Sequence, residues 1–286
     1  MDEQEFERDE QLLEARRLKR LEQRRRRKLQ QRIVLGVLLV ILILSLVLIV
    51  RGCKSRNAAQ ETEQPGTAAA QPEASASVVP TEPDTTVTVA AVGDIMMYNE
   101  QIDAAKQADG TYDFTSSFAA VSGSTISADL TVGNLELNFC GEPYAGKPDF
   151  RAPESLAKTL ASIGFDVMQT ANTYSIQNGL SGLQSTIRYL DAAGLSHVGT
   201  YAAQDDKTSL GGVLLKNVNG VKIAFIAYTK GLNSLTLPEG EEYAVDVLYT
   251  DYASDFNKIN QTALLDSVNA AKALSPDVII AMLHWG

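Results

Sequence analysis

The chain has 286 residues, of which 45% are hydrophobic and 21% charged. This composition allows one or two domains with a hydrophobic core and excludes a chain that is disordered throughout. The net charge of −10 is unevenly spread, because 14 of the 25 basic but only 8 of the 35 acidic residues lie within the first 56 positions. The remainder is strongly acidic, and such a surface repels nucleic acid and anionic lipid unless a cation intervenes. We therefore expect no nucleic-acid partner.

Residues 33–50 form an apolar run, IVLGVLLVILILSLVLIV, between Arg32 and Arg51. At about 1.5 Å per residue, a helix over this run is long enough to cross the hydrocarbon layer of a membrane. Residues 24–28 are all basic and precede the run, so the positive-inside rule keeps the N-terminus in the cytoplasm. The sequence thus predicts a charged cytoplasmic arm over 1–32 and one transmembrane helix over 33–50. Everything after the helix is expected outside the cell membrane.

Two other readings of this segment remain open. A cleaved signal peptide is disfavoured because the charged arm is long and the apolar run exceeds the usual limit of about 15 residues. Cys53 would be the lipidated residue of a lipoprotein, but Arg51 two positions earlier fits that cleavage box poorly. We favour an uncleaved anchor.

The two cysteines, Cys53 and Cys140, are too few for a disulfide framework or a thiolate metal site.

Residues 51–86 are rich in Ala, Gln, Glu, Pro, Ser and Thr and contain no aromatic side chain. Such a stretch buries too little apolar area to offset the entropy lost on ordering. We predict a disordered extracytoplasmic linker over 51–86 and a folded domain over 87–286.

The folded domain alternates strand-like and helix-like segments. Apolar runs that end at polar residues predict strands over 87–92, 129–132, 165–168 and 277–283. Between these strands, the helical spacing of apolar residues and the Gly and Pro residues at the segment ends predict helices over 153–163, 180–193 and 256–274. Residues 213–215 and 223–226 flank the turn pair Asn219-Gly220, which is typical of a hairpin. Strands alternating with helices indicate an α/β layered domain, with its first strand buried.

Polar side chains follow several of these runs, and they are Asp94, Asn134, Glu136, Asn172 and His284. Polar groups at the carboxyl ends of strands converge on one crevice in open α/β sheets. Carboxylate, amide oxygen and imidazole ligands suit a divalent cation such as Mn²⁺, Zn²⁺ or Mg²⁺, and two cations together activate water and clamp phosphoryl oxygens. The alternative is purely structural: Asp94 caps a helix, Asn134 and Glu136 are turn residues, and His284 is a buried, satisfied histidine.

Several short blocks of the sequence carry a family resemblance. In chain order they are Gly93-Asp94-Ile95-Met96, Gly133-Asn134-Leu135-Glu136, Phe150-Arg151-Ala152-Pro153, Gly164-Phe165-Asp166, Thr170-Ala171-Asn172 and His284-Trp285-Gly286. Together they resemble the capsule-synthesis CapA family, which is associated with making or exporting poly-γ-glutamate at the bacterial surface. The resemblance implies a two-sheet sandwich flanked by helices, similar to the calcineurin-type metallophosphoesterases.

The resemblance also implies site residues. It assigns Asp94, Asn134, Glu136 and His284 to the metal site, and His284 and Asn172 to catalysis. The block that begins at Thr170 departs from the family, which has Ala-Asn-Asn-His where this chain has Ala171-Asn172-Thr173-Tyr174. Thr173 is a poorer metal ligand than an amide, Tyr174 is a weaker acid than histidine, and Gln177 stands where the family has an aspartate. These changes predict a degenerate site.

Family members continue beyond the His-Trp-Gly block with a glutamate, a long helix and a Gly-His-x-Pro-His block. We therefore expect the domain to be incomplete at its C-terminus and unable to assemble a two-metal site.

Three functions follow from these observations. The first is a membrane-anchored extracytoplasmic CapA-like protein in biosynthesis or export of a surface polymer, whose partners are the anionic polymer or its membrane synthase. The second is a metal-dependent phosphoesterase, or a γ-glutamyl hydrolase or transferase, of the cell envelope. The third is a sensor or scaffold unrelated to capsule, because a fold does not fix a function.

Overall fold

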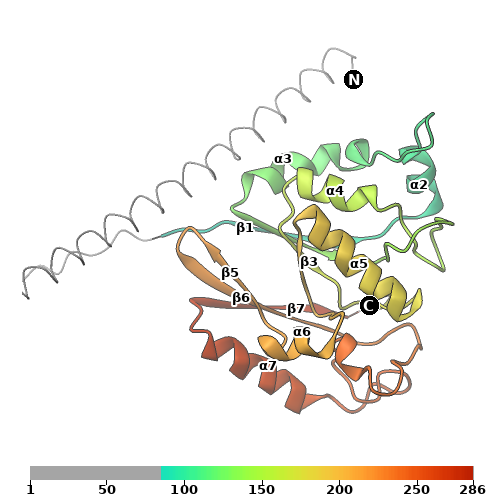
Figure 1. Cartoon of the computed structure of the whole chain (residues 1–286). Coiled ribbons are helices and arrows are strands. Elements are labelled where there is room, and N and C mark those ends of the chain that lie inside the picture. Colours follow the sequence, from blue (N-terminus) through green and yellow to red (C-terminus); the bar gives the residue numbers. More distant parts are fainter. Residues whose placement is uncertain (1–84, 286) are drawn as a thin grey trace, which may run out of the picture. The chain divides into compact units, whose positions relative to one another are not determined.

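The computed structural model describes residues 85–285, and the seven strands of this part form two sheets (Figure 1). The first sheet is parallel and has the order β1 (Val89–Ile95), β2 (Leu130–Leu135), β3 (Val167–Gln169) and β4 (Ser196–Val198). The second sheet has the order β5 (Leu214–Val218), β6 (Val221–Thr229) and β7 (Val278–His284). Strand β6 pairs antiparallel with β5 and parallel with β7.

The sequence predicted most of these strands. Strands β2, β3 and β7 and the β5–β6 hairpin are confirmed. The prediction that the first strand is buried is wrong, since most of β1 is accessible and Val89 is 40% exposed. The reason is that β1 lies at the edge of its sheet, with a neighbouring strand on one side only.

Within residues 85–285, six α-helices and two short 3₁₀ helices connect the strands. They are α2 (Asn99–Ala105), η1 (Thr115–Phe118), α3 (Ala119–Ser127), α4 (Ser155–Ser162), α5 (Gly179–Ala193), α6 (Gln204–Ser209), η2 (Glu242–Ala244) and α7 (Gln261–Ala273). The helices predicted over 153–163 and 180–193 are confirmed as α4 and α5. The third helix was predicted from residue 256 but begins at Gln261, because Phe256 takes a positive φ of 54° and Asn260 caps the Ala263 N–H.

The two sheets pack face to face between layers of helices. On the outer face of the first sheet, Leu135 and Met168 pack against Leu156 and Leu160 of α4. Between the sheets, a separate core contains Val132 and Val167 of the first sheet and Phe225 and Ala227 of the second. On the far face of the second sheet, Ala224 and Ile226 pack against Ala271 of α7. Residues of β6 thus alternate between the two cores, and the expected two-sheet, helix-flanked α/β fold is observed.

None of the helices within residues 85–285 is long and apolar enough to cross a membrane. The predicted cytoplasmic arm (1–32) and membrane span (33–50) lie outside the described residues, as does the predicted linker up to residue 84. These assignments stay predictions.

The connection after α4 generates a prediction about packing. Gly164 has φ +96°, and a Cβ there would lie 2.9 Å from the Ile126 Cα atom of α3. Gly194, which ends α5, has φ +77° but no atom within 4 Å of such a Cβ. We expect Gly194→Ala to lower the free energy of unfolding by about 1–2 kcal/mol through backbone strain alone. In Gly164→Ala, the free energy of unfolding should fall by about 1–3 kcal/mol more, because the new Cβ overpacks against α3.

Equilibrium urea unfolding of the full-length chain and the two variants measures this difference. Equal losses in the two variants would contradict the close approach of α3 to the segment after α4.

Candidate metal centre

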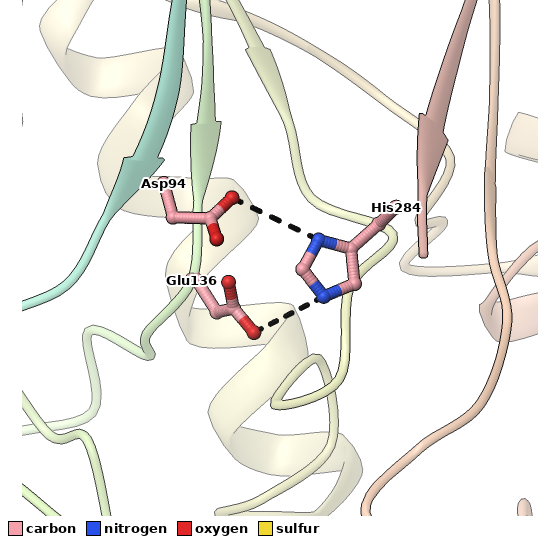
Figure 2. A group of neighbouring side chains, drawn as sticks. All are labelled: Asp94, Glu136 and His284. Carbon is pink, nitrogen blue, oxygen red and sulfur yellow. Dashed lines mark ion pairs between the residues drawn. The ribbon is translucent and has the colours of Figure 1, made fainter. Parts of the chain in front are cut away.

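Three side chains with metal-binding atoms meet where the two sheets end. Asp94 belongs to β1, Glu136 directly follows β2, and His284 is the last residue of β7, and Figure 2 shows them facing one another. One ligand atom from each lies within 4.8 Å of the others. The sequence predicted that these residues converge at an edge of one sheet. They do converge, but His284 comes from the second sheet, so the cluster lies between the carboxyl ends of both.

The imidazole of His284 lies between the two carboxylates. Its Nε2 atom is 3.2 Å from Glu136 Oε1, and its Nδ1 atom is 3.8 Å from Asp94 Oδ1. The side chains of Glu136 and His284 are only 5% and 6% exposed, whereas that of Asp94 is 52% exposed. Solvent, substrate or a metal ion therefore reaches the cluster from the Asp94 side.

Local strand structure explains this arrangement. The β1–β2 register shifts between Val92 and Asp94, immediately before the cluster. Such irregularities re-aim a side chain at the end of a strand. Strand β2 is buried along its whole length, so Asn134 and the following Glu136 enter the cluster from within the protein.

Asn134 holds the three side chains together. Its Nδ2 atom lies 2.8 Å from Asp94 Oδ1, 3.2 Å from Glu136 Oε2 and 3.1 Å from His284 Nδ1. Because an amide nitrogen can only donate, a hydrogen bond to Nδ1 assigns the ring proton to Nε2. That proton faces Glu136 and also Thr173, whose Oγ1 atom is 2.9 Å away. One amide nitrogen has two hydrogens for these three acceptors, so the cluster has more acceptors than its donors satisfy.

Asn172 fixes the orientation of Asn134. The Asn172 amide donates to the Leu135 carbonyl at 2.7 Å and to Asn134 Oδ1 at 3.1 Å, while its own oxygen accepts from the Tyr174 N–H at 3.1 Å. Two backbone groups thus set Asn172, and Asn172 in turn directs the Asn134 N–H groups toward the cluster. Coordination through Asn134 Oδ1 would require that amide to turn. The predicted metal role of Asn134 and catalytic role of Asn172 stay predictions, and in this structure both residues position others.

The three positions that depart from the family have distinct surroundings. Thr173 hydrogen-bonds His284, a contact that the sequence analysis missed although Thr173 directly follows the predicted site residue Asn172. The Tyr174 ring packs on Phe150 with 4.4 Å between centroids. Burial, reinforced by the Glu136 charge, raises the pKa of Tyr174, so its phenol stays protonated at neutral pH. Gln177 turns to Asn233, whose amide donates to it at 2.9 Å.

The chemistry of the cluster fits a divalent cation. Two carboxylates and one imidazole nitrogen are suitable ligands for Zn²⁺, Mn²⁺ or Mg²⁺. Among residues 85–285, only His284 places a basic nitrogen within 4.0 Å of either carboxylate. When bound, such an ion polarises substrate oxygens and makes a water molecule more acidic. Asn134 and Thr173 would hold the imidazole and carboxylates in place for it. Three protein ligands leave room for a water or substrate ligand.

Comparison with known proteins identifies the family. The model of the family described as bacterial capsule synthesis protein PGA_cap matches residues 88–286. This chain belongs to that family. The resemblance inferred from the short sequence blocks is thereby confirmed.

This chain is similar to two proteins from Bacillus. It is 25% identical over 209 residues to the capsule biosynthesis protein CapA of Bacillus anthracis, covering 70% of this chain and 46% of that protein. It is 24% identical over 219 residues to the PGA biosynthesis protein CapA of Bacillus subtilis, covering 73% of this chain and 51% of that protein. An uncharacterised protein of Sinorhizobium fredii is 36% identical over 81 residues, 25% of this chain and 17% of that protein. The chain therefore spans about half the length of the Bacillus relatives.

The amide of Asn134 provides a test of the metal centre. Asn134→Asp replaces the shared donor with a third carboxylate, so we expect the free energy of unfolding in EDTA to fall by about 1–3 kcal/mol. Added Zn²⁺ should recover that loss, because the new carboxylate is a better metal ligand than the amide it replaces.

Asn138→Asp is the matched control. Asn138 is also buried, but its hydrogen bonds go to Ser175 and Asn178 and none goes to Asp94, Glu136 or His284. Its variant should be destabilised in urea unfolding without recovery by Zn²⁺. The same Zn²⁺ response in both variants would contradict a metal centre beside Asn134.

Proposed function

We propose that this PGA_cap protein binds one divalent cation through Asp94, Glu136 and His284 and uses it in biosynthesis or export of an anionic polymer at the cell surface. The observation that carries the proposal is the convergence of these three ligands at the ends of three strands from two sheets. Membership of the capsule synthesis family supports the process, and similarity to the PGA biosynthesis protein CapA of Bacillus subtilis supports poly-γ-glutamate as the polymer.

The charge of the protein explains why a cation is needed. From residue 57 onward the chain carries 27 acidic and 11 basic residues, so a polyanion is repelled at long range. A cation held between two carboxylates reverses that repulsion locally. Because Asp94 lies on the open side of the cluster, the cation would contact polymer carboxylates from there.

A second function, metal-dependent hydrolysis or transfer at a phosphoester or γ-glutamyl bond, is favoured by one feature of the cluster. Three protein ligands with an accessible side are the arrangement of catalytic metal sites, whereas structural sites close all positions with protein ligands. The protonated Tyr174 phenol lies near enough to Glu136 for that charge to affect its pKa. It would act as a hydrogen-bond donor to a substrate oxygen.

The proposed location is the outer face of the cell membrane, with the N-terminus in the cytoplasm. The apolar run at residues 33–50 and the basic residues at 24–28 support it. In this arrangement the partners are the polymer itself or the membrane synthase that makes it.

Polymer binding by the full-length chain tests the proposal. Fluorescently labelled poly-γ-glutamate should bind at least about tenfold more tightly in Zn²⁺, Mn²⁺ or Mg²⁺ than in EDTA, a difference of about 1.4 kcal/mol. Asp94→Asn should abolish this metal dependence because it removes a ligand charge. Asp103→Asn, an exposed acidic position on α2 outside the cluster, should behave as wild type.

The same samples separate the two functions. If polymer length on a gel stays constant, the protein binds without cleaving; if it shortens only with metal, and not in His284→Ala, the protein is a hydrolase. Polymer binding that is equally strong in EDTA, or absent under all conditions, would contradict the proposal.

A further inference from the structure

A second recess lies away from the metal cluster, between α5, β4 and α6. Its volume is about 390 Å³, within the range of about 300–1,000 Å³ typical of small-molecule pockets. Ile187, Val198, Tyr201 and Leu214 supply apolar parts of its wall. None of its lining residues belongs to the cluster of Asp94, Glu136 and His284, so its occupant is independent of the function proposed above.

Charged groups from two helices face a histidine in this pocket. His197 of β4 has its Nε2 atom 4.0 Å from Asp191 Oδ1 of α5, and Asp206 of α6 also lines the pocket. Burial lowers the pKa of His197, while the charges of Asp191 and Asp206 and the Thr200 backbone act in the opposite direction. Asp191 lies beside the imidazole, whereas Asp206 lines the pocket from α6 and also accepts a hydrogen bond from the Ala203 N–H at 2.9 Å.

The pocket also has a cationic side. Arg188 lines it from α5, one helical turn before Asp191, and is exposed. Asp191 is exposed as well, with 63% of its side chain accessible. The nearby lysines are engaged elsewhere, since Lys207 pairs with Asp246 at 2.7 Å and Lys216 donates to Ser196 at 3.0 Å. The pocket thus offers two carboxylates, one guanidinium and an apolar wall.

We propose that this pocket binds a small zwitterion of the α-amino acid type with a short, uncharged side chain. The ammonium group pairs with Asp191 and Asp206, which line the pocket from two different helices. The carboxylate pairs with Arg188, whose planar guanidinium matches it in a bidentate manner. The aliphatic side chain contacts Val198 and Leu214.

The two histidines of the chain, His197 and His284, make the test specific. Full-length protein labelled at the histidine rings gives two ring signals, which His284→Asn assigns. Norvaline, a zwitterion with a propyl side chain, should shift the His197 signal saturably at millimolar concentration and leave the His284 signal in place. Butylamine and butyrate, which each carry one of the two charges, should bind at least about tenfold more weakly.

Variants identify the charges responsible. Arg188→Gln should weaken the binding of norvaline by about tenfold or more, because the contact with its carboxylate is lost. The binding of butylamine, which has no carboxylate, should stay unchanged. Lys158→Gln, an exposed cation on α4 outside the pocket, should leave norvaline binding at the wild-type level. Absence of a His197 shift with norvaline, equal binding of butylamine, or unchanged affinity in Arg188→Gln would each overturn the proposal.

Discussion

The interaction on which the site depends is the repulsion between two carboxylates held at neighbouring strand ends. Asp94 lies in β1 and Glu136 follows its paired strand β2, and their ligand atoms lie within 4.8 Å of each other. Unit charges about 4 Å apart repel by about 4 kcal/mol at an effective dielectric constant of about 20. Between the carboxylates lie the His284 imidazole and the Asn134 amide. A divalent cation would neutralise this repulsion, which gives the unloaded cluster a direct electrostatic reason to bind metal.

The fold supplies the geometry that keeps these charges together. Pairing of β1 with β2 places the carboxylates side by side, and the core between the sheets places β7 so that His284 reaches them. Behind this first layer, Asn172 fixes Asn134 through backbone hydrogen bonds, and Thr173 holds the other ring nitrogen of His284. The cluster thus keeps its own hydrogen-bond support although residues 173, 174 and 177 depart from the family.

The strand ends and the three residues of the cluster could be predicted from the sequence for a simple physical reason. Apolar runs that end in polar residues mark the carboxyl ends of buried strands, so Asp94, Glu136 and His284 were found without a structure. Strand neighbours are not encoded in such runs, and the assignment of β7 to a second sheet depends on its pairing with β6. The exposure of β1 follows from its edge position in the same way.

The orientation of side chains was beyond sequence reasoning. Whether Asn134 presents oxygen or nitrogen to the cluster depends on Asn172, 38 positions later, and on the Leu135 carbonyl. The late start of α7 depends on the local conformation of Phe256, which the helical spacing of apolar residues does not reveal. The pocket at His197 combines side chains of α5, β4 and α6, and no short motif marks it.

Anomalous diffraction from crystals of the full-length protein grown with Zn²⁺ tests the central claim most directly. The account predicts one strong peak at about 2.0–2.2 Å from oxygens of Asp94 and Glu136 and from a ring nitrogen of His284. A fully occupied peak elsewhere, for example at His197, or no peak between the two carboxylates, would contradict it.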